Sequence, residues 1–190
     1  IPPGFPHDGV THETALNYSV GFRGPNGRDL ISSFADYVLE NDLGGEHYSD
    51  PDLTCREHPG RVEEYELERL RNMMIDMIRQ PEDFKQWFGS FVTTPRHELD
   101  IAPAEPAYEE AEVVDALLGG EKRSRLSGLR VLHIGDSFFV HSEQLDTTDA
   151  GALDALCRYT SLGQEELGSG LKNPAFVSEL TRLINQGYWY

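Results

Sequence analysis

Two proline- and glycine-rich junctions limit how this chain can fold. They are Gly24-Pro25-Asn26-Gly27 and Pro103-Ala104-Glu105-Pro106, which carry the residue types that end helices and strands. The hydrophobic pattern between them is helical, whereas the segments on either side contain strand-like runs. The sequence therefore predicts an α+β chain in three pieces: residues 1–23, a helical domain over 24–102, and a mixed domain over 107–190.

The first piece reads as a strand, a turn and a second strand. Small or polar residues alternate with bulky apolar ones from position 15 onward, which is the period of a β-strand. Asn17 and Ser19 fall on the small face, which is typical of the lining of a barrel mouth. We therefore expect these two side chains to face a cavity.

A stiff turn in the same piece presents one imidazole. Pro2 and Pro3 restrict the backbone and Pro6 favours an extended residue before it, so His7 follows a rigid support. A preorganised metal ligand needs such a support. The same pattern is also that of an ordinary turn followed by a solvated histidine.

The helical domain contains three predicted helices. The first, over 28–43, has apolar residues on two sides, which favours either a contact between two copies of the chain or burial under a neighbouring helix. The second, over 61–80, holds all three methionines of the chain in one seam, which we interpret as helix–helix packing. The third begins at Pro81 and carries an aromatic stripe of Phe84, Trp87, Phe88 and Phe91, which we assign to the core.

The last domain combines helices with one hairpin and so resembles a winged helix. Helices are predicted over 109–118, 150–159 and 175–185, and strands over 129–134 and 137–140 are joined at Gly135-Asp136. Residues 107–190 hold seven Lys and Arg against thirteen Asp and Glu. Because a duplex-binding face needs several basic phosphate contacts, we expect no direct nucleic-acid partner.

The charge and hydropathy of the whole chain exclude further classes of function. The formal net charge of −17 repels phosphate backbones and weakly favours a basic partner. No apolar run reaches the length of a membrane span, so we expect no membrane partner and a cytoplasmic location. Cys55 and Cys157 are too few to form a disulfide framework.

Several strings of residues carry a more specific resemblance. They are Ile1 to His7, Asn17 to Arg23, Phe34 to Leu39, Tyr48 to Asp52, Phe84 to Gly89, Arg96 to Pro103, and Gly187 to Trp189. Together they resemble the C-terminal half of the JmjC-type (cupin) bacterial ribosomal oxygenases. These enzymes use Fe(II) and 2-oxoglutarate to hydroxylate an arginine of a large-subunit ribosomal protein.

The resemblance implies roles for particular residues. His7 would be an iron ligand, with Asn17 and Ser19 contacting the cosubstrate or supporting the site. Residues 1–23 would be the last strands of the cupin double-stranded β-helix, 24–102 a helical domain that forms a homodimer, and 107–190 a winged-helix-like domain. The other iron ligands, from an H-x-D motif, would lie before residue 1, so we expect this piece alone to be inactive.

Two alternatives remain at the level of the sequence. His141-Ser142-Glu143 has the spacing of a metal-ligand pair, but it lies after the predicted hairpin and is more typical of a polar surface turn. The whole chain also fits a non-enzymatic, acidic dimerisation module with a winged helix that recruits a basic partner.

Overall fold

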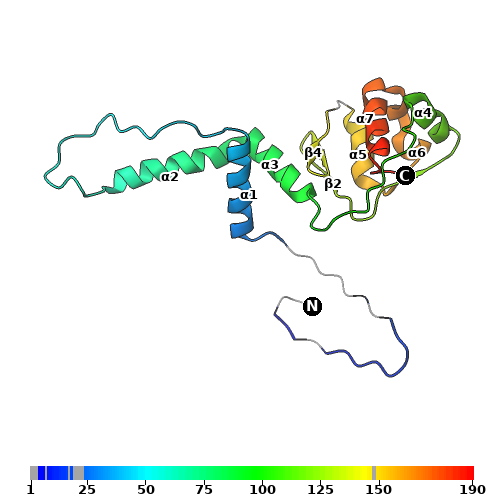
Figure 1. Ribbon diagram of the computed structural model, residues 1–190, viewed down its shortest axis with the longest axis horizontal. Helices are drawn as coiled ribbons and strands as arrows, with labels where there is room; N and C mark the ends of the chain where they lie inside the picture. The colour runs from blue at the N-terminus through cyan, green and yellow to red at the C-terminus, as the bar shows by residue number, and fades with distance from the viewer. Residues whose placement is uncertain (1–3, 7, 17, 19–23, 147–148) are drawn as a thin grey trace.

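The chain forms an elongated molecule. The computed structural model describes residues 4–6, 8–16, 18, 24–146 and 149–190. The C-terminal domain lies at one end, and a long helix with the loop before it projects at the other (Figure 1). This arrangement leaves the projecting helix with much of its surface outside any common core.

Three helices make up the projecting part and its base: α1 (Gly27–Glu40), α2 (Glu64–Arg79) and α3 (Pro81–Thr93). The α1 helix begins where the sequence predicts, because the Asn26 side chain accepts hydrogen bonds from the backbone N–H groups of Arg28 at 2.9 Å and Asp29 at 3.0 Å. Pro81 opens α3, where its missing N–H is not needed. The prediction of three helices is confirmed, with ends displaced by a few residues.

An aromatic cluster joins α1 to α3. The rings of Phe34 and Trp87 lie 5.1 Å apart in an edge-to-face arrangement, and Trp87 Nε1 donates a hydrogen bond to Ser33 Oγ at 3.1 Å. The predicted core position is confirmed for Trp87, which is buried, whereas Phe88 and Phe91 are half-buried and Phe84 is 38% exposed. On the other side of α1, Ile31 and Leu39 are exposed, so within the described chain this helix packs on one side and not on two.

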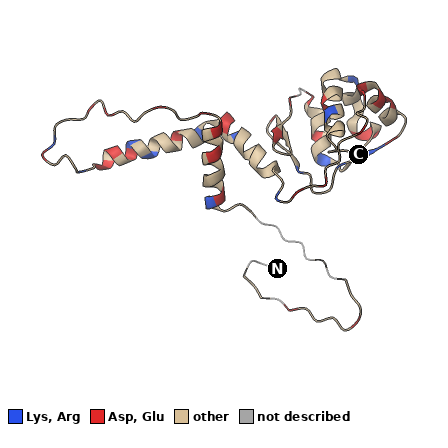
Figure 2. Cartoon of the chain, viewed as in Figure 1, with Lys and Arg blue, Asp and Glu red and all other residues tan. Residues whose placement is uncertain are grey.

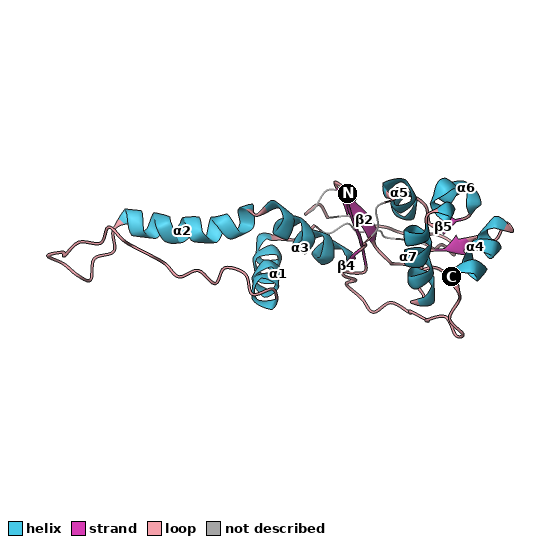
Figure 3. Ribbon diagram, turned by 90° about the horizontal axis from the view of Figure 1, so that it is seen from above, coloured by secondary structure: helices cyan, strands magenta, loops and turns pink. Residues whose placement is uncertain are grey.

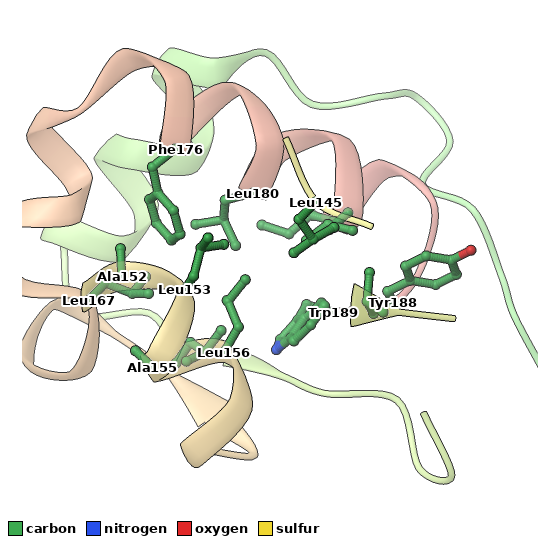
Figure 4. Packing of buried hydrophobic residues seen from close by; sticks show 14 of the residues in the cluster. Leu145, Ala152, Leu153, Ala155, Leu156, Leu167, Phe176, Leu180, Tyr188 and Trp189 are labelled. Carbon is green, nitrogen blue, oxygen red and sulfur yellow. The ribbon is translucent and has the colours of Figure 1, made fainter. Parts of the chain in front are cut away.

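The C-terminal domain surrounds a single apolar core. Its elements, seen from above in Figure 3, are α4 (Glu110–Leu118), β1 (Arg123–Ser124), β2 (Val131–Ile134), β3 (Ser137–Val140), β4 (Glu143–Gln144), α5 (Ala150–Arg158), β5 (Ser161–Leu162), α6 (Gln164–Leu167), the 3-10 helix η1 (Gly168–Lys172) and α7 (Pro174–Asn185). Strands β2, β3 and β4 form one antiparallel sheet, and β1 pairs with β5. Figure 4 shows α5 and α7 placing Leu153, Leu156 and Leu180 toward Trp189 near the C-terminus.

The predicted hairpin is confirmed at Gly135, whose φ of 58° suits the turn between β2 and β3. The two-residue strands β1, β4 and β5 and the short α6 were not predicted. Such elements are too short to carry a periodic signal, and β1 and β5 form only by pairing with each other across a long stretch of chain.

Helix α3 packs on the hairpin as well as on α1. The Thr93 hydroxyl accepts a hydrogen bond from the backbone N–H of Ser142 at 3.0 Å, and Arg130 Nη1 donates to the carbonyl oxygen of Val92 at 3.0 Å. Thr93 is fully buried at this contact. The sequence predicts one domain over residues 24–102 and another over 107–190, and α3 is in contact with elements of both.

The predicted strands of the first piece are absent from the part of it that the structure describes. Residues 4–6, 8–16 and 18 contain no strand, and Phe5, Val10, Leu16 and Tyr18 are exposed. A strand needs a hydrogen-bonded neighbour and a layer that covers its apolar face, and the described chain provides neither for these residues. Across the described residues, no helix has the length and hydrophobicity of a membrane span.

Candidate interaction surface

The residues predicted to bind iron and cosubstrate lie outside the described part of the chain. These are His7, Asn17 and Ser19. Among the residues that are described, no three His, Cys, Asp or Glu side chains come together as a possible metal site. Because a facial iron site needs two imidazoles and a carboxylate, the described residues do not fit Fe(II), and no chemical step follows from them.

The alternative triplet at 141–143 is structural. His141 and Ser142 have positive φ angles of 48° and 69° and form the turn between β3 and β4. The His141 ring lies 5.0 Å from the ring of Tyr188, and Glu143 pairs with Arg182 at 2.9 Å. The two candidate ligands thus point to separate partners, in agreement with the surface-turn interpretation.

Helix α2 has two distinct apolar or partly apolar faces. On one face Glu66, Arg69, Met73 and Met77 are half-buried. Next to it runs a stripe of Leu67, Leu70, Met74 and Ile78, which are between 45% and 65% exposed. We call these four residues the exposed stripe. They recur at helical spacing, so they form one continuous apolar surface.

The methionine seam predicts helix–helix packing, and the described residues bury none of this seam under another helix. None of the sixteen residues of α2 is buried. Met74 lies in the exposed stripe, while Met77 lies under Gly44 of the preceding loop. A helix with so large an apolar face outside any core is typical of a protein–protein contact.

The loop before α2 is fastened to the half-buried face. We call residues 44–63 the strap. Arg56 Nη1 pairs with Glu66 at 2.7 Å, and Arg69 pairs with both Asp50 and Asp52. The hydrogen bond from Arg56 lowers the pKa of Glu66 to about 2.

A wide cleft of about 1270 Å³ separates α1 and α3 from the chain that leads to the C-terminal domain. Asp36 and Glu40 contribute acidic groups to its lining, while Arg96 and Arg130 contribute basic ones. The charges of the lining are thus mixed, so the cleft favours neither a cation nor an anion.

Acidic residues are spread over the molecule. Figure 2 shows them along α1 and α2 and on α4, with Lys and Arg interspersed. A surface of this kind favours solubility and a basic partner more than it marks one binding site.

These features define a protein with a projecting helical arm joined to a domain of helices and one hairpin, and comparisons identify that domain. The family model described as ROXA-like winged helix matches residues 76–190, so the chain belongs to this family. The predicted winged helix is therefore confirmed, and the match begins at the end of α2 and includes α3.

The comparisons also identify the most informative relatives. The chain is 54% identical, over all 190 residues, to ribosomal protein uL16 3-hydroxylase of Escherichia coli, and it spans 51% of that protein. A crystal structure of the E. coli ribosomal oxygenase YcfD matches 90% of this chain with a TM-score of 0.87 at 53% identity. A YcfD structure in complex with cobalt and 2-oxoglutarate matches equally well, with a TM-score of 0.86. The chain covers 47% of each of these two structures, so it spans about half the length of its relatives. The resemblance to ribosomal oxygenases is confirmed.

The strap contacts were missed in the sequence. Arg56 lies 10 residues from Glu66, and Arg69 lies 17 to 19 residues from its two carboxylates. Separations of this kind follow no helical or strand period, so charge patterning alone could not have paired them.

Proposed function

We propose that this chain is part of a ribosomal oxygenase that uses Fe(II) and 2-oxoglutarate to hydroxylate an arginine of the large-subunit protein uL16. The identity of 54% with the E. coli uL16 3-hydroxylase over the full length of the chain carries this proposal. The net charge of −17 suits a basic ribosomal protein as substrate, and a cytoplasmic location follows from that substrate.

Within the whole enzyme, His7 would be one of the ligands of the metal, with Asn17 and Ser19 near the cosubstrate. Cobalt accepts the same imidazole and carboxylate ligands as Fe(II), so the cobalt and 2-oxoglutarate complex of YcfD supports this choice of cofactors. When bound, the iron would activate dioxygen, which is the oxidant of the hydroxylation, with 2-oxoglutarate as the two-electron co-reductant. The other ligands would come from the part of the enzyme that this chain does not include, and the isolated chain would be inactive.

We assign the helical arm to homodimerisation. The exposed stripe of α2 and the exposed residues Ile31 and Leu39 of α1 offer apolar surface on a projecting arm. A twofold contact between identical helices would bury such stripes against each other. We expect the winged helix to bind no nucleic acid, since its hairpin is in contact with α3 and its charge is negative.

The decisive experiment uses the intact enzyme that contains this chain. Turnover of 2-oxoglutarate should depend on a uL16 peptide that contains the target arginine, and a His7→Ala variant should lose both turnover and hydroxylation. His12→Ala is the matched control, because His12 is exposed and has no assigned role. Full activity of His7→Ala would contradict the assignment of His7 as a metal ligand. If 2-oxoglutarate turnover by the parent enzyme did not depend on the peptide, the assignment of uL16 as substrate would be contradicted.

The non-enzymatic alternative, an acidic dimerisation module with a winged helix, is less well supported. It accounts for the arm and for the winged helix. It does not account for the fact that the identity with a hydroxylase extends over the whole chain, residues 1–23 included. An intact protein that binds uL16 without consuming 2-oxoglutarate would favour it.

A further inference from the structure

The strap contacts α2 at three successive points. Gly44 lies on Met77 so closely that a Cβ atom at Gly44 would be 2.5 Å from the sulfur. Asp50 and Asp52 then bind Arg69, and near its far end the strap binds Glu66 through Arg56. The strap therefore runs antiparallel to α2, and its three contacts follow one another along the half-buried face.

The two arginine contacts each include a carboxylate that is largely shielded from solvent. Arg69 reaches Asp50 and Asp52 through different nitrogens, and the Asp50 side chain is only 6% exposed. Arg56 and Glu66 side chains are 18% and 17% exposed. Both guanidinium groups also lie near the Tyr65 ring, at 5.8 Å for Arg56 and 5.5 Å for Arg69.

Arg56 also closes the end of the strap. Its Nη1 donates to the carbonyl oxygen of Arg61 at 2.9 Å, and its Nη2 donates to the Tyr65 hydroxyl at 2.7 Å. The strap has no helix or strand, and loops of this length without secondary structure tend to be either functional or disordered. The side-chain contacts are thus what can order it.

The strap lies beside the exposed stripe. The half-buried residues Glu66, Arg69 and Met77 each precede a stripe residue by one position, so the two faces adjoin around the helix. A partner that covers the stripe would therefore meet the edge of the strap, where Leu53 is exposed. The strap would then form part of the surface that such a partner meets.

We propose that the strap is latched to α2 by Arg56 and Arg69 within a single chain, and that this latch presents a preformed surface to the second copy. The second part of this inference rests on the proposed dimer, whereas the first does not. Arg56 and Arg69 are then positioning residues: they act on the contact by ordering the strap before association. A preordered surface binds more tightly, because less conformational entropy is lost on binding.

A nitroxide on Cys55 reports directly on the strap. Cys55 is exposed in the strap, whereas Cys157 is half-buried and its burial raises the pKa of its thiol to about 11. At neutral pH the label therefore reacts selectively with Cys55, which mass spectrometry can verify. The experiment uses the full chain and a Met74→Arg variant that places a charge in the exposed stripe to prevent association.

The latch is tested by comparing two substitutions on the same helix. Arg69→Gln removes the pairs with Asp50 and Asp52, whereas Arg71→Gln removes the same charge but only a pair with Glu68 within α2. In the Met74→Arg background we expect an immobilised label in the parent and in Arg71→Gln, and a mobile label in Arg69→Gln. A label that is mobile in the monomeric parent and immobile only in the dimer would overturn the latch, while leaving the dimer intact.

The effect on association is measured without the Met74→Arg change. Sedimentation equilibrium should give a dimer dissociation constant raised about fivefold by Arg69→Gln and unchanged by Arg71→Gln, as for the loss of a well-placed ion pair. An unchanged constant for Arg69→Gln would overturn the positioning role. A parent chain that is monomeric at every concentration would instead refute the proposed dimer, and the label would still decide on the latch.

Discussion

The backbone of Gly89 in α3 lies directly against the ring of Phe139 in β3. A Cβ atom at position 89 would be 2.5 Å from three ring carbons, and Phe139 is completely buried, so its ring cannot swing out into solvent. Glycine is thus required for α3 to approach the hairpin this closely. The contact makes α3 a part of the winged helix as well as of the arm.

The first prediction follows from this contact. Gly89→Ala should lower the free energy of unfolding by about 1–3 kcal/mol, the usual cost of overpacking a core. Urea denaturation followed by circular dichroism measures it. Gly60→Ala is the control, because no atom lies within 4 Å of a Cβ atom at Gly60. Equal stability of Gly89→Ala and the parent would mean that α3 does not pack against Phe139 in solution.

The second prediction concerns the buried hydroxyl at the same junction. Thr93 donates to the carbonyl oxygen of Gly89 at 2.8 Å and accepts from Ser142 N–H at 3.0 Å. Thr93→Val keeps the shape but leaves that N–H without its acceptor, so we expect a loss of about 1–3 kcal/mol in the free energy of unfolding. Thr94→Val should cost less, because the Thr94 hydroxyl, which donates to the Ser90 carbonyl at 2.8 Å, is on an exposed residue. Equal losses in the two variants would argue against a special role for Thr93.

The third prediction tests the arm as a dimer contact. Ile31→Arg would bury an unpaired charge if the exposed side of α1 meets a second copy, so light scattering should show a shift from dimer to monomer. Ser32→Arg introduces the same charge at an exposed polar position of α1 and should leave the dimer in place. If Ile31→Arg left the dimer unaffected, the dimer contact would not include the exposed side of α1.

The fourth prediction is a pH dependence of the strap. Arg56 lowers the pKa of Glu66 from its ordinary value of 4.5 to about 2. A lowered pKa in the folded chain means that the contact is fully stabilising above about pH 4.5 and is lost as the pH falls toward 2. The label on Cys55 should therefore become mobile over this interval. In the Glu66→Gln variant the mobility of the label should not change over the same pH interval. A change of equal size in this variant would mean that a group other than Glu66 causes the pH dependence.

Local sequence patterns predicted the helices well. Asn26 and Pro81 mark the starts of α1 and α3, and Gly135 marks the hairpin turn, since capping and turn formation depend on neighbouring residues. The helical spacing of the aromatic stripe of α3 predicts a buried face, and Trp87 is its buried member. The candidate ligands His7, Asn17 and Ser19 rest on resemblance, and they remain predictions.

The sequence by itself determined the family, most of the helices and the acidic character of this protein, because family follows from identity, charge from composition, and caps and helical periods from residues close together in the chain. Only the tertiary structure decided that α3 packs against the hairpin, that the methionines of α2 are divided between a strap and an exposed stripe, and that Arg69 binds Asp50. These contacts join residues far apart in the chain, and their energies depend on burial and geometry that no local pattern encodes.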